Sequence, residues 1–125
     1  MKFIISENKL NKVIFNYLDG VMDSVDYYGD VWFHFKGELY CEAKYDSTSK
    51  RLQISTFVVR ELMDIFGLED FYDTEDIFIE YLISKLDGVK SDSINVVLAP
   101  YRNEIPMYII LQFKKHFKLE KPDED

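Results

Sequence analysis

The residues of this chain best suited to acid–base or nucleophilic chemistry are two histidines, His34 and His116, and a single cysteine, Cys41. If His34 and Glu42 lie on neighbouring antiparallel strands, they are diagonal neighbours on one face, and their side chains can reach across that distance. A histidine beside a carboxylate suits a general base, so this pair predicts a small hydrolase as one alternative. The other interpretation of His34 is a strand-surface histidine packed beside aromatic rings.

The sequence contains no recognisable metal or thiol motif. Two histidines are too few for a histidine-based metal site unless carboxylates complete it. The acids Asp19, Asp23, Asp26 and Asp30 are spaced by four, three and four residues, whereas an EF-hand loop needs alternate acids, a central glycine and a final glutamate. Cys41 is expected to face the core as a buried, inert thiol. We therefore expect no cofactor and no metal.

The acidic residues are concentrated in one segment. Residues 61–84 hold eight acids and no lysine or arginine, and the rest of the chain has fifteen residues of each sign, so the net charge of −8 resides in this segment. Its densest group is Glu69, Asp70, Asp73, Glu75 and Asp76. One interpretation is helix capping and a solvated face. The alternatives are a docking surface for a basic partner protein, or a nucleic-acid mimic that inhibits a DNA-binding protein.

The first part of the chain predicts a helix followed by a three-strand antiparallel meander. Apolar residues at helical spacing favour a helix over residues 7–18, with Ser6 as its N-cap. Alternating residues favour strands over 31–35, 39–45 and 51–55. No clear element is expected between these two units, over residues 19–30.

The turn lengths predict the register of the meander. A loop over residues 36–38 places Phe33 opposite Cys41 and Phe35 opposite Leu39, and a loop over residues 47–50 places Tyr45 opposite Leu52. Their apolar side chains then share one face. The other face carries Trp32, His34 and Tyr40, which form a second candidate partner-binding surface.

Two helices are expected after the meander. The first, over residues 57–66, has Ser55 or Thr56 as its cap and Gly67 at its end. The second, over residues 74–86, has Asp73 or Thr74 as its cap and Gly88 at its end. If their acids point outward, the apolar positions of the segment are buried against the meander: Leu62, Ile65, Phe66, Phe78, Tyr81 and Leu82.

The last third predicts a strand over residues 94–99 and a second element over 107–117. The Tyr, Ile and Phe content of this second element favours a strand, which would form a C-terminal β-hairpin across residues 101–106. The alternative is a helix that begins at Met107, after Pro106. The fold class is α+β in both cases, with a single domain over residues 1–119 and an acidic, flexible tail over 120–125.

The opening of the chain resembles that of small uncharacterised accessory proteins of tailed bacteriophages. The likeness covers about the first twenty residues, and it is carried by Met-Lys-Phe-Ile-Ile-Ser-Glu at residues 1–7 and by Leu10, Val13, Ile14, Tyr17, Leu18 and Asp19. It implies a viral origin and an accessory role. It brings no fold, activity or functional residue.

Composition narrows the class of function. The net charge of −8 argues against direct binding to the phosphates of a nucleic acid. The longest apolar run, residues 107–111, is far shorter than the ~18 residues that a membrane span needs. One cysteine and no recognisable signal peptide favour a cytoplasmic or virion-associated protein. We therefore expect a non-enzymatic viral accessory or structural protein that binds a protein partner and is able to form homo-oligomers.

Overall fold

The computed structural model describes residues 7–117 of the chain. The α+β class is confirmed. Ser6, the proposed N-cap, and the acidic tail lie outside the described residues. The elements are α1 (Glu7–Val21), β1 (Met22–Tyr27), β2 (Asp30–Phe35), β3 (Tyr40–Cys41), β4 (Ala43–Asp46), β5 (Arg51–Ser55), α2 (Thr56–Phe66), α3 (Phe71–Ser84), a short 3-10 turn η1 (Ser91–Ser93), β6 (Asn95–Ala99), β7 (Asn103–Glu104) and α4 (Met107–Gln112).

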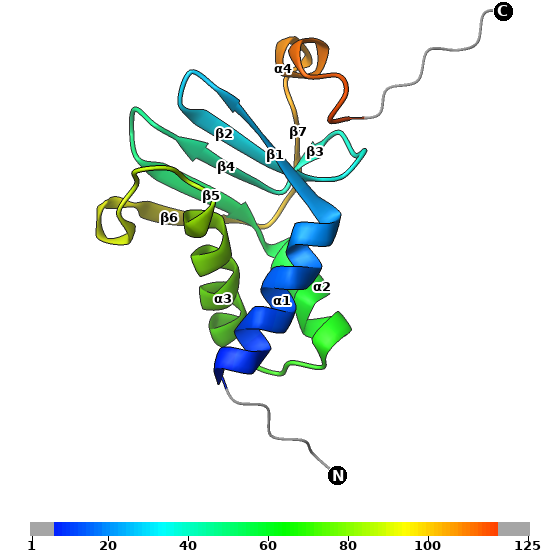
Figure 1. Cartoon of the computed structure of the whole chain (residues 1–125), viewed down its shortest axis with the longest axis vertical. Helices are drawn as coiled ribbons and strands as arrows, with labels where there is room; N and C mark the ends of the chain where they lie inside the picture. Colours follow the sequence, from blue (N-terminus) through cyan, green and yellow to red (C-terminus); the bar gives the residue numbers. More distant parts are fainter. Residues whose placement is uncertain (1–6, 118–125) are drawn as a thin grey trace, which may run out of the picture.

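The main sheet has five strands in the order β1-β2-β4-β5-β6, and β3 pairs separately with β7. All neighbours in the main sheet are antiparallel except β5 and β6, which run parallel. Helices α1, α2 and α3 cover one face of the sheet, and α4 lies on the opposite side (Figure 1). The sheet is therefore covered fully on one face and only in part on the other.

A strand that the sequence pattern does not indicate, β1, occupies the region left without an element between residues 19 and 30. It forms a hairpin with β2, and Tyr28 and Gly29 at the turn both have positive φ, as a tight two-residue turn requires. Met22 and Val25 are buried, but they are three residues apart and belong to the cores on opposite faces. This strand therefore lacks the period-two apolar pattern by which strands are recognised.

Two glycines near this hairpin allow a matched test of the turn. Gly29 has φ +90°, and a Cβ there would lie 3.0 Å from the Ser47 Oγ, whereas Gly20 lies within α1 and a Cβ there would meet nothing within 4 Å. We expect Gly29→Ala to lower the free energy of unfolding by about 1–2 kcal/mol. Gly20→Ala should raise it by about 0.5–1 kcal/mol. Urea unfolding of both variants checks the pair, and equal effects would contradict this description of the turn.

The register of the meander is confirmed at one turn and corrected at the other. Tyr45 lies opposite Leu52 as expected. Phe33, however, lies opposite Ala43 and not Cys41. Glu42 interrupts the expected strand over 39–45, because its N–H donates to the Phe33 carbonyl and its own carbonyl accepts from Ser55. This extra residue separates β3 from β4 and frees β3 to pair with β7.

The expected cross-strand pairing of Phe35 with Leu39 is also corrected. Phe35 lies opposite Met22 of β1 and not opposite Leu39. Its carbonyl closes the following turn by accepting from the Glu38 N–H. Leu39 instead accepts from the Ile105 N–H, next to the short pairing of β3 with β7.

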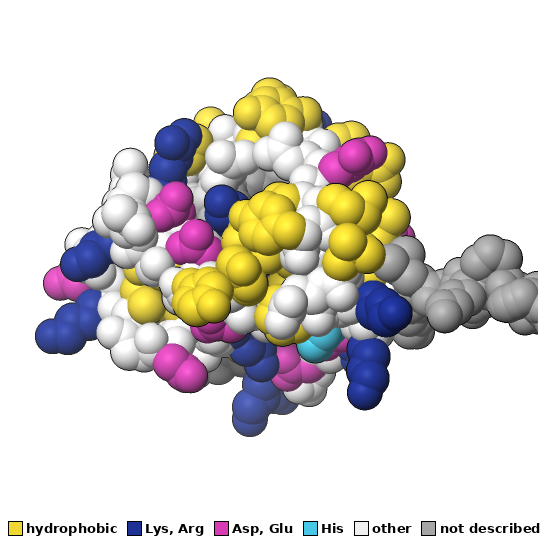
Figure 2. Space-filling model, turned by 90° about the horizontal axis from the view of Figure 1, so that it is seen from above, with side chains coloured by type: hydrophobic (Ala, Val, Ile, Leu, Met, Phe, Trp, Pro, Cys, Tyr) yellow, Lys and Arg dark blue, Asp and Glu magenta, His cyan; other side chains and the backbone are white. Residues whose placement is uncertain are grey.

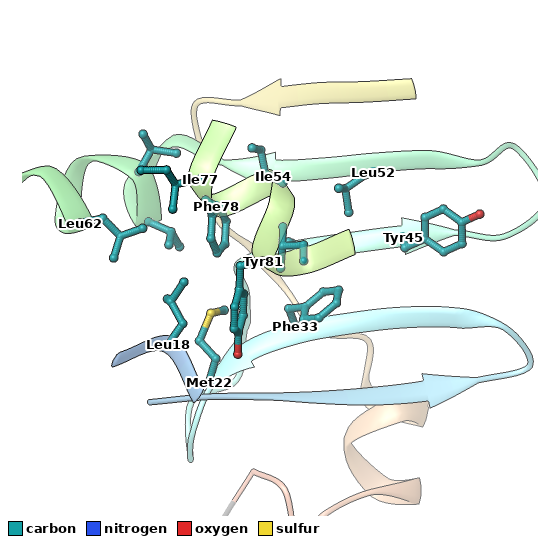
Figure 3. Close-up of a cluster of buried hydrophobic side chains, with 14 of the residues drawn as sticks. Leu18, Met22, Phe33, Tyr45, Leu52, Ile54, Leu62, Ile77, Phe78 and Tyr81 are labelled. Atoms are coloured by element: carbon teal, nitrogen blue, oxygen red, sulfur yellow. The ribbon is translucent and has the colours of Figure 1, made fainter. Parts of the chain in front are cut away.

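The main core lies between the sheet and the three helices (Figure 3). Helix α2 matches its expected bounds to within one residue, with Ser55 as the cap and Gly67 in the left-handed conformation at its end. Helix α3 starts earlier than expected, because Asp70 and not Asp73 or Thr74 accepts the capping bond, and it ends at Ser84. Four of the six apolar positions expected to be buried in this segment are buried, whereas Phe66 is half-buried and Ile65 is 46% exposed.

The C-terminal region follows the helical alternative. Residues 107–112 form α4, and β6 pairs in parallel with β5. The two helices between β5 and β6 return the chain to the end of the sheet where β5 started, so β6 runs in the same direction as β5. No hairpin between residues 94–99 and 107–117 is formed.

Candidate functional site

The strand face proposed as a partner-binding surface is largely covered by the C-terminal part of the chain. Trp32 is 3% exposed and His34 is 0% exposed, whereas Tyr40 is 41% exposed. The expectation that Trp32 and His34 lie on the surface is therefore corrected. Trp32 belongs to a second apolar cluster, which the sheet shares with α4 and its flanking residues, and His34 stacks on Phe117 of this cluster. The members of the cluster are Val25, Trp32, Ile105, Ile109, Ile110 and Phe117.

His34 lies beside an aromatic ring of this cluster. Its ring stacks on Phe117 with centroids 4.5 Å apart, and its Nδ1 lies 2.8 Å from the Phe35 carbonyl oxygen. Burial lowers the pKa of His34, although the carbonyl of Phe35 and nearby Asp23 oppose this effect. Within residues 7–117, Nε2 has no hydrogen-bond partner and no hydrogen bond joins His34 to Glu42. The structure therefore does not join His34 to Glu42, the pair from which the hydrolase alternative is inferred.

Glu42 takes part in a different interaction, a buried ion pair with Arg102. Its carboxylate is fully buried, and Oε2 accepts hydrogen bonds from both Nε (2.9 Å) and Nη2 of Arg102. Burial raises the pKa of Glu42, and the bonds from Arg102 oppose the rise. Among the described residues, no partner reaches Oε1. This pair links the bulge between β3 and β4 to the segment that leads into α4.

Arg102 makes further contacts around this pair. Its Nη2 donates to Glu38 at 3.0 Å, and its guanidinium lies over the rings of Tyr40 (4.6 Å) and Phe57 (5.5 Å). Arg102 thus fixes Tyr40, the one exposed member of the proposed strand face. No local pattern identifies this residue in the sequence, because Arg102 and Glu42 are 60 positions apart.

A cavity of about 250 Å³ lies on the side of the sheet opposite the three helices, and Trp32, Cys41, Lys44 and Tyr101 contribute to its lining. Cys41 is half-buried, packs against the second cluster and donates a hydrogen bond from Sγ to the Ala43 carbonyl at 3.1 Å. Burial, and to a lesser degree the charge of Glu42, raises the pKa of Cys41 to about 12. The thiol is therefore protonated near neutral pH and is a poor nucleophile.

The four aspartates between residues 19 and 30 make separate interactions: Asp19, Asp26 and Asp30 accept hydrogen bonds from different groups, and Asp23 lies 4.0 Å from His116. Asp19 accepts from Tyr81 and pairs with Lys85. Asp26 accepts from the Gly29 N–H in the β1–β2 turn. Over residues 7–117, no group of three or more His, Cys, Asp or Glu side chains is placed to hold a metal ion.

The acidic group lies around the start of α3, at the opposite end of the molecule from α4 (Figure 1). Its side chains are exposed except for Glu75, which is half-buried. Burial raises the pKa of Glu75, and Asp76 adds to the rise. Asp70 caps α3 by accepting from the Asp73 N–H. Capping therefore accounts for Asp70 locally, while docking of a basic partner at the acidic group as a whole stays a prediction.

An exposed apolar surface on α4 was not expected from the sequence. We define the α4 surface by Met107 (64% exposed), Tyr108 (57%), Leu111 (63%) and Tyr28 (88%). The rings of Tyr28, Tyr27 and Tyr108 form a chain, with centroid distances of 4.6 Å and 5.7 Å. Figure 2 shows hydrophobic side chains gathered at this end of the molecule. Exposed apolar patches are typical of contact sites in small soluble proteins.

The helix α4 exposes this surface because it is apolar around most of its circumference. Ile109 and Ile110 are buried against the sheet, so Met107, Tyr108 and Leu111 point away from it. A continuous apolar run gives no periodicity that would separate these two sides. The signal that could have identified the surface is Pro106 directly before the run, which starts a helix too short to bury every side chain.

Comparisons with protein-family models, with curated proteins and with solved structures gave no match to this chain. None of the helices within residues 7–117 combines the length and the apolar character that a membrane span requires.

Proposed function

We propose that this protein is a non-enzymatic interaction protein, an accessory or structural component of a virus, that binds another protein through the α4 surface. The observation that supports this proposal is the exposure of Met107, Tyr108 and Leu111 on one short helix, continuous with Tyr28 of the β1–β2 turn. The viral role rests on the resemblance of the opening residues. The hydrolase alternative loses its main support, because His34 and Glu42 make no hydrogen bond with each other.

The partner that fits the α4 surface is a protein that offers a groove or patch of apolar side chains. Tyrosine and methionine are enriched at the centres of protein interfaces, where their large side chains enter pockets on the partner. The described part of the α4 surface contains no charged residue, and Lys114 and Lys115 follow the helix as exposed neighbours. We therefore infer apolar contacts at the centre of the interface and polar contacts at its rim.

The α4 surface is also held in place before binding. Ile109 and Ile110 anchor the helix to the sheet, and Arg102 fixes the segment that leads into it through the buried Glu42. A surface that is already ordered loses less conformational entropy when it binds. The α4 surface is therefore suited to bind a partner without a folding step, in contrast to a segment that becomes ordered only on binding.

The experiment that tests this proposal first captures a partner with the wild-type protein and then compares two surface variants by their affinity for that partner. Tagged wild-type protein is used to capture a partner from the cells in which it naturally acts, and the partner is then purified and titrated. We expect the double variant Met107→Lys/Leu111→Lys to weaken the measured affinity by about tenfold or more. Tyr72→Lys, which changes a 71% exposed residue of α3, should leave the affinity unchanged.

Two outcomes would contradict the proposal. One is equal affinity of the wild type and the double variant for the purified partner. The other is binding to lipid vesicles that depends on Met107 and Leu111 while no protein partner is captured. Circular dichroism of each variant verifies that the fold is retained before the affinities are compared.

A further inference from the structure

Strand β6 is an edge of the main sheet, and its outer side has no partner strand among the described residues (Figure 3). Its sequence, Asn-Val-Val-Leu-Ala over Asn95–Ala99, carries no charge. The other edge strand, β1, contains Asp23 and Asp26. Charged side chains on an edge strand discourage pairing with another chain, and an uncharged edge strand is open to it.

The direction of the backbone groups on β6 follows from one hydrogen bond. The Asn95 N–H donates to the Lys50 carbonyl at 2.8 Å, so the N–H and C=O groups of Asn95 point toward β5. Backbone groups alternate in direction along a strand, so Val96 and Leu98 direct theirs outward. Within residues 7–117 these outward groups make no backbone hydrogen bond. Another extended segment can pair with the backbone groups of both residues at once.

We propose that β6 pairs antiparallel with β6 of a second copy of this chain, which joins the two sheets across a two-fold axis at Val97. In this register Val96 of one copy lies opposite Leu98 of the other. These are the residues with outward backbone groups, so each pair exchanges two hydrogen bonds. Val97 then lies opposite Val97 at a non-hydrogen-bonded position. The interface is isologous, as most homodimer interfaces are.

The side chains of β6 suit this self-pairing. Val96 packs against the main core on the helix-covered face, and Leu98, two residues on, projects to the same face and is 37% exposed. The dimer brings Val96 and Leu98 together as apolar cross-strand neighbours on that face. The two Val97 side chains meet on the opposite face. No charged residue of β6 opposes a like charge in this register.

The expected dimer is weak and reversible. One pair of five-residue strands buries much less than the roughly 1,200–2,000 Å² of a standard stable interface. Each chain also carries a net charge of −8, which adds repulsion. We therefore expect the dissociation constant of the dimer to lie within the range of protein concentrations that sedimentation can cover. At the low end of this range the protein should be mostly monomeric.

The test uses sedimentation velocity of the full chain from about 5 to about 500 µM, together with charge variants at the two-fold axis. We expect wild-type protein to shift from monomer toward dimer over this range. Val97→Lys alone and Val97→Glu alone should stay monomeric, because like charges then lie opposite each other. An equal mixture of these two variants should dimerise again. Far-UV circular dichroism verifies that each variant is folded.

A second measurement tests the register and does not depend on the charge variants. On a Cys41→Ser background, Val97→Cys should form a disulfide-linked dimer under mild oxidation, because cross-strand pairs at non-hydrogen-bonded positions have Cα atoms only about 4.5 Å apart. Asn95→Cys, on the same strand and face, should not. Wild-type protein that remains monomeric at the highest concentration, or equal crosslinking at residues 95 and 97, would overturn the proposal.

Discussion

Replacing Arg102 with alanine is expected to lower the free energy of unfolding by roughly 3–4 kcal/mol near neutral pH, because it leaves the fully buried carboxylate of Glu42 without its counter-ion. In the wild type, Oε1 of Glu42 has no partner among the described residues, and both hydrogen bonds to Oε2 come from Arg102. The Arg102→Ala variant therefore leaves both oxygens of the buried carboxylate without a partner among these residues. The loss is measured by urea unfolding, followed by circular dichroism. Glu38→Ala is the matched control, since Glu38 binds the same guanidinium from a half-exposed position and should contribute at most about 1 kcal/mol.

The pH dependence of this loss identifies its cause. Burial raises the pKa of Glu42 above the usual 4.5, so the folded protein binds a proton more readily than the unfolded chain does. Stability that depends on this group therefore increases as the pH falls from neutral toward 4.5. The deficit of Arg102→Ala relative to wild type should shrink on acidification, because the protonated carboxyl is neutral. The Arg102→Ala/Glu42→Gln double variant, compared with Glu42→Gln alone, should show a deficit that does not change with pH. A deficit that is constant with pH in Arg102→Ala itself would show that lost packing, and not the buried charge, is responsible.

Replacing Phe117 with alanine is expected to cost about 3 kcal/mol, which is the second large effect. Phe117 is 1% exposed and stacks on His34, so its removal opens the second cluster beside His34 and Trp32. The fluorescence of Trp32, the only tryptophan, should shift toward the red as water reaches it. Leu111→Ala, at an exposed position of the same region, should cost less than about 0.5 kcal/mol.

The titration of His34 provides an independent measure of the same change. Burial lowers the pKa of His34 below its usual 6.5, so the unfolded chain binds a proton more readily at this residue. The corresponding stability is present above pH 6.5 and is lost as the pH falls through the lowered pKa. In Phe117→Ala the pKa should rise toward 6.5, as seen by NMR of the ring protons. An unchanged pKa together with unchanged stability would contradict the assignment of Phe117 as the residue that covers His34.

The parts of the fold that the sequence predicts are those with a strong local pattern. Helix α2 has a capping Ser55, a terminal Gly67 and an apolar stripe between them, and all three signals agree. The pairing of Tyr45 with Leu52 follows from the length of one loop. The acidic group is exposed apart from Glu75, and Asp70 at the start of α3 satisfies one of the free N–H groups of the helix.

The parts that the sequence does not predict depend on contacts between distant segments. Strand β1 has buried residues on two faces, so its pattern is not that of a half-buried strand. Glu42 creates a bulge that an alternating pattern does not reveal. Trp32 and His34 occupy positions that a lone meander would expose, and only the return of the chain through α4 to Phe117 covers them. The same return creates the α4 surface and the buried pair of Glu42 with Arg102.

The measurement that tests the proposed function most directly is site-specific photo-crosslinking in the cells where the protein acts. A photoreactive phenylalanine analogue replaces either Tyr108 on the α4 surface or Tyr72 on α3, two tyrosines that are both more than half exposed. We predict one discrete crosslinked protein from position 108, which disappears when Met107→Lys and Leu111→Lys are added, and no such product from position 72. Equal crosslinking from the two positions, or crosslinking at 108 that survives the two lysines, would contradict a partner-binding role for the α4 surface.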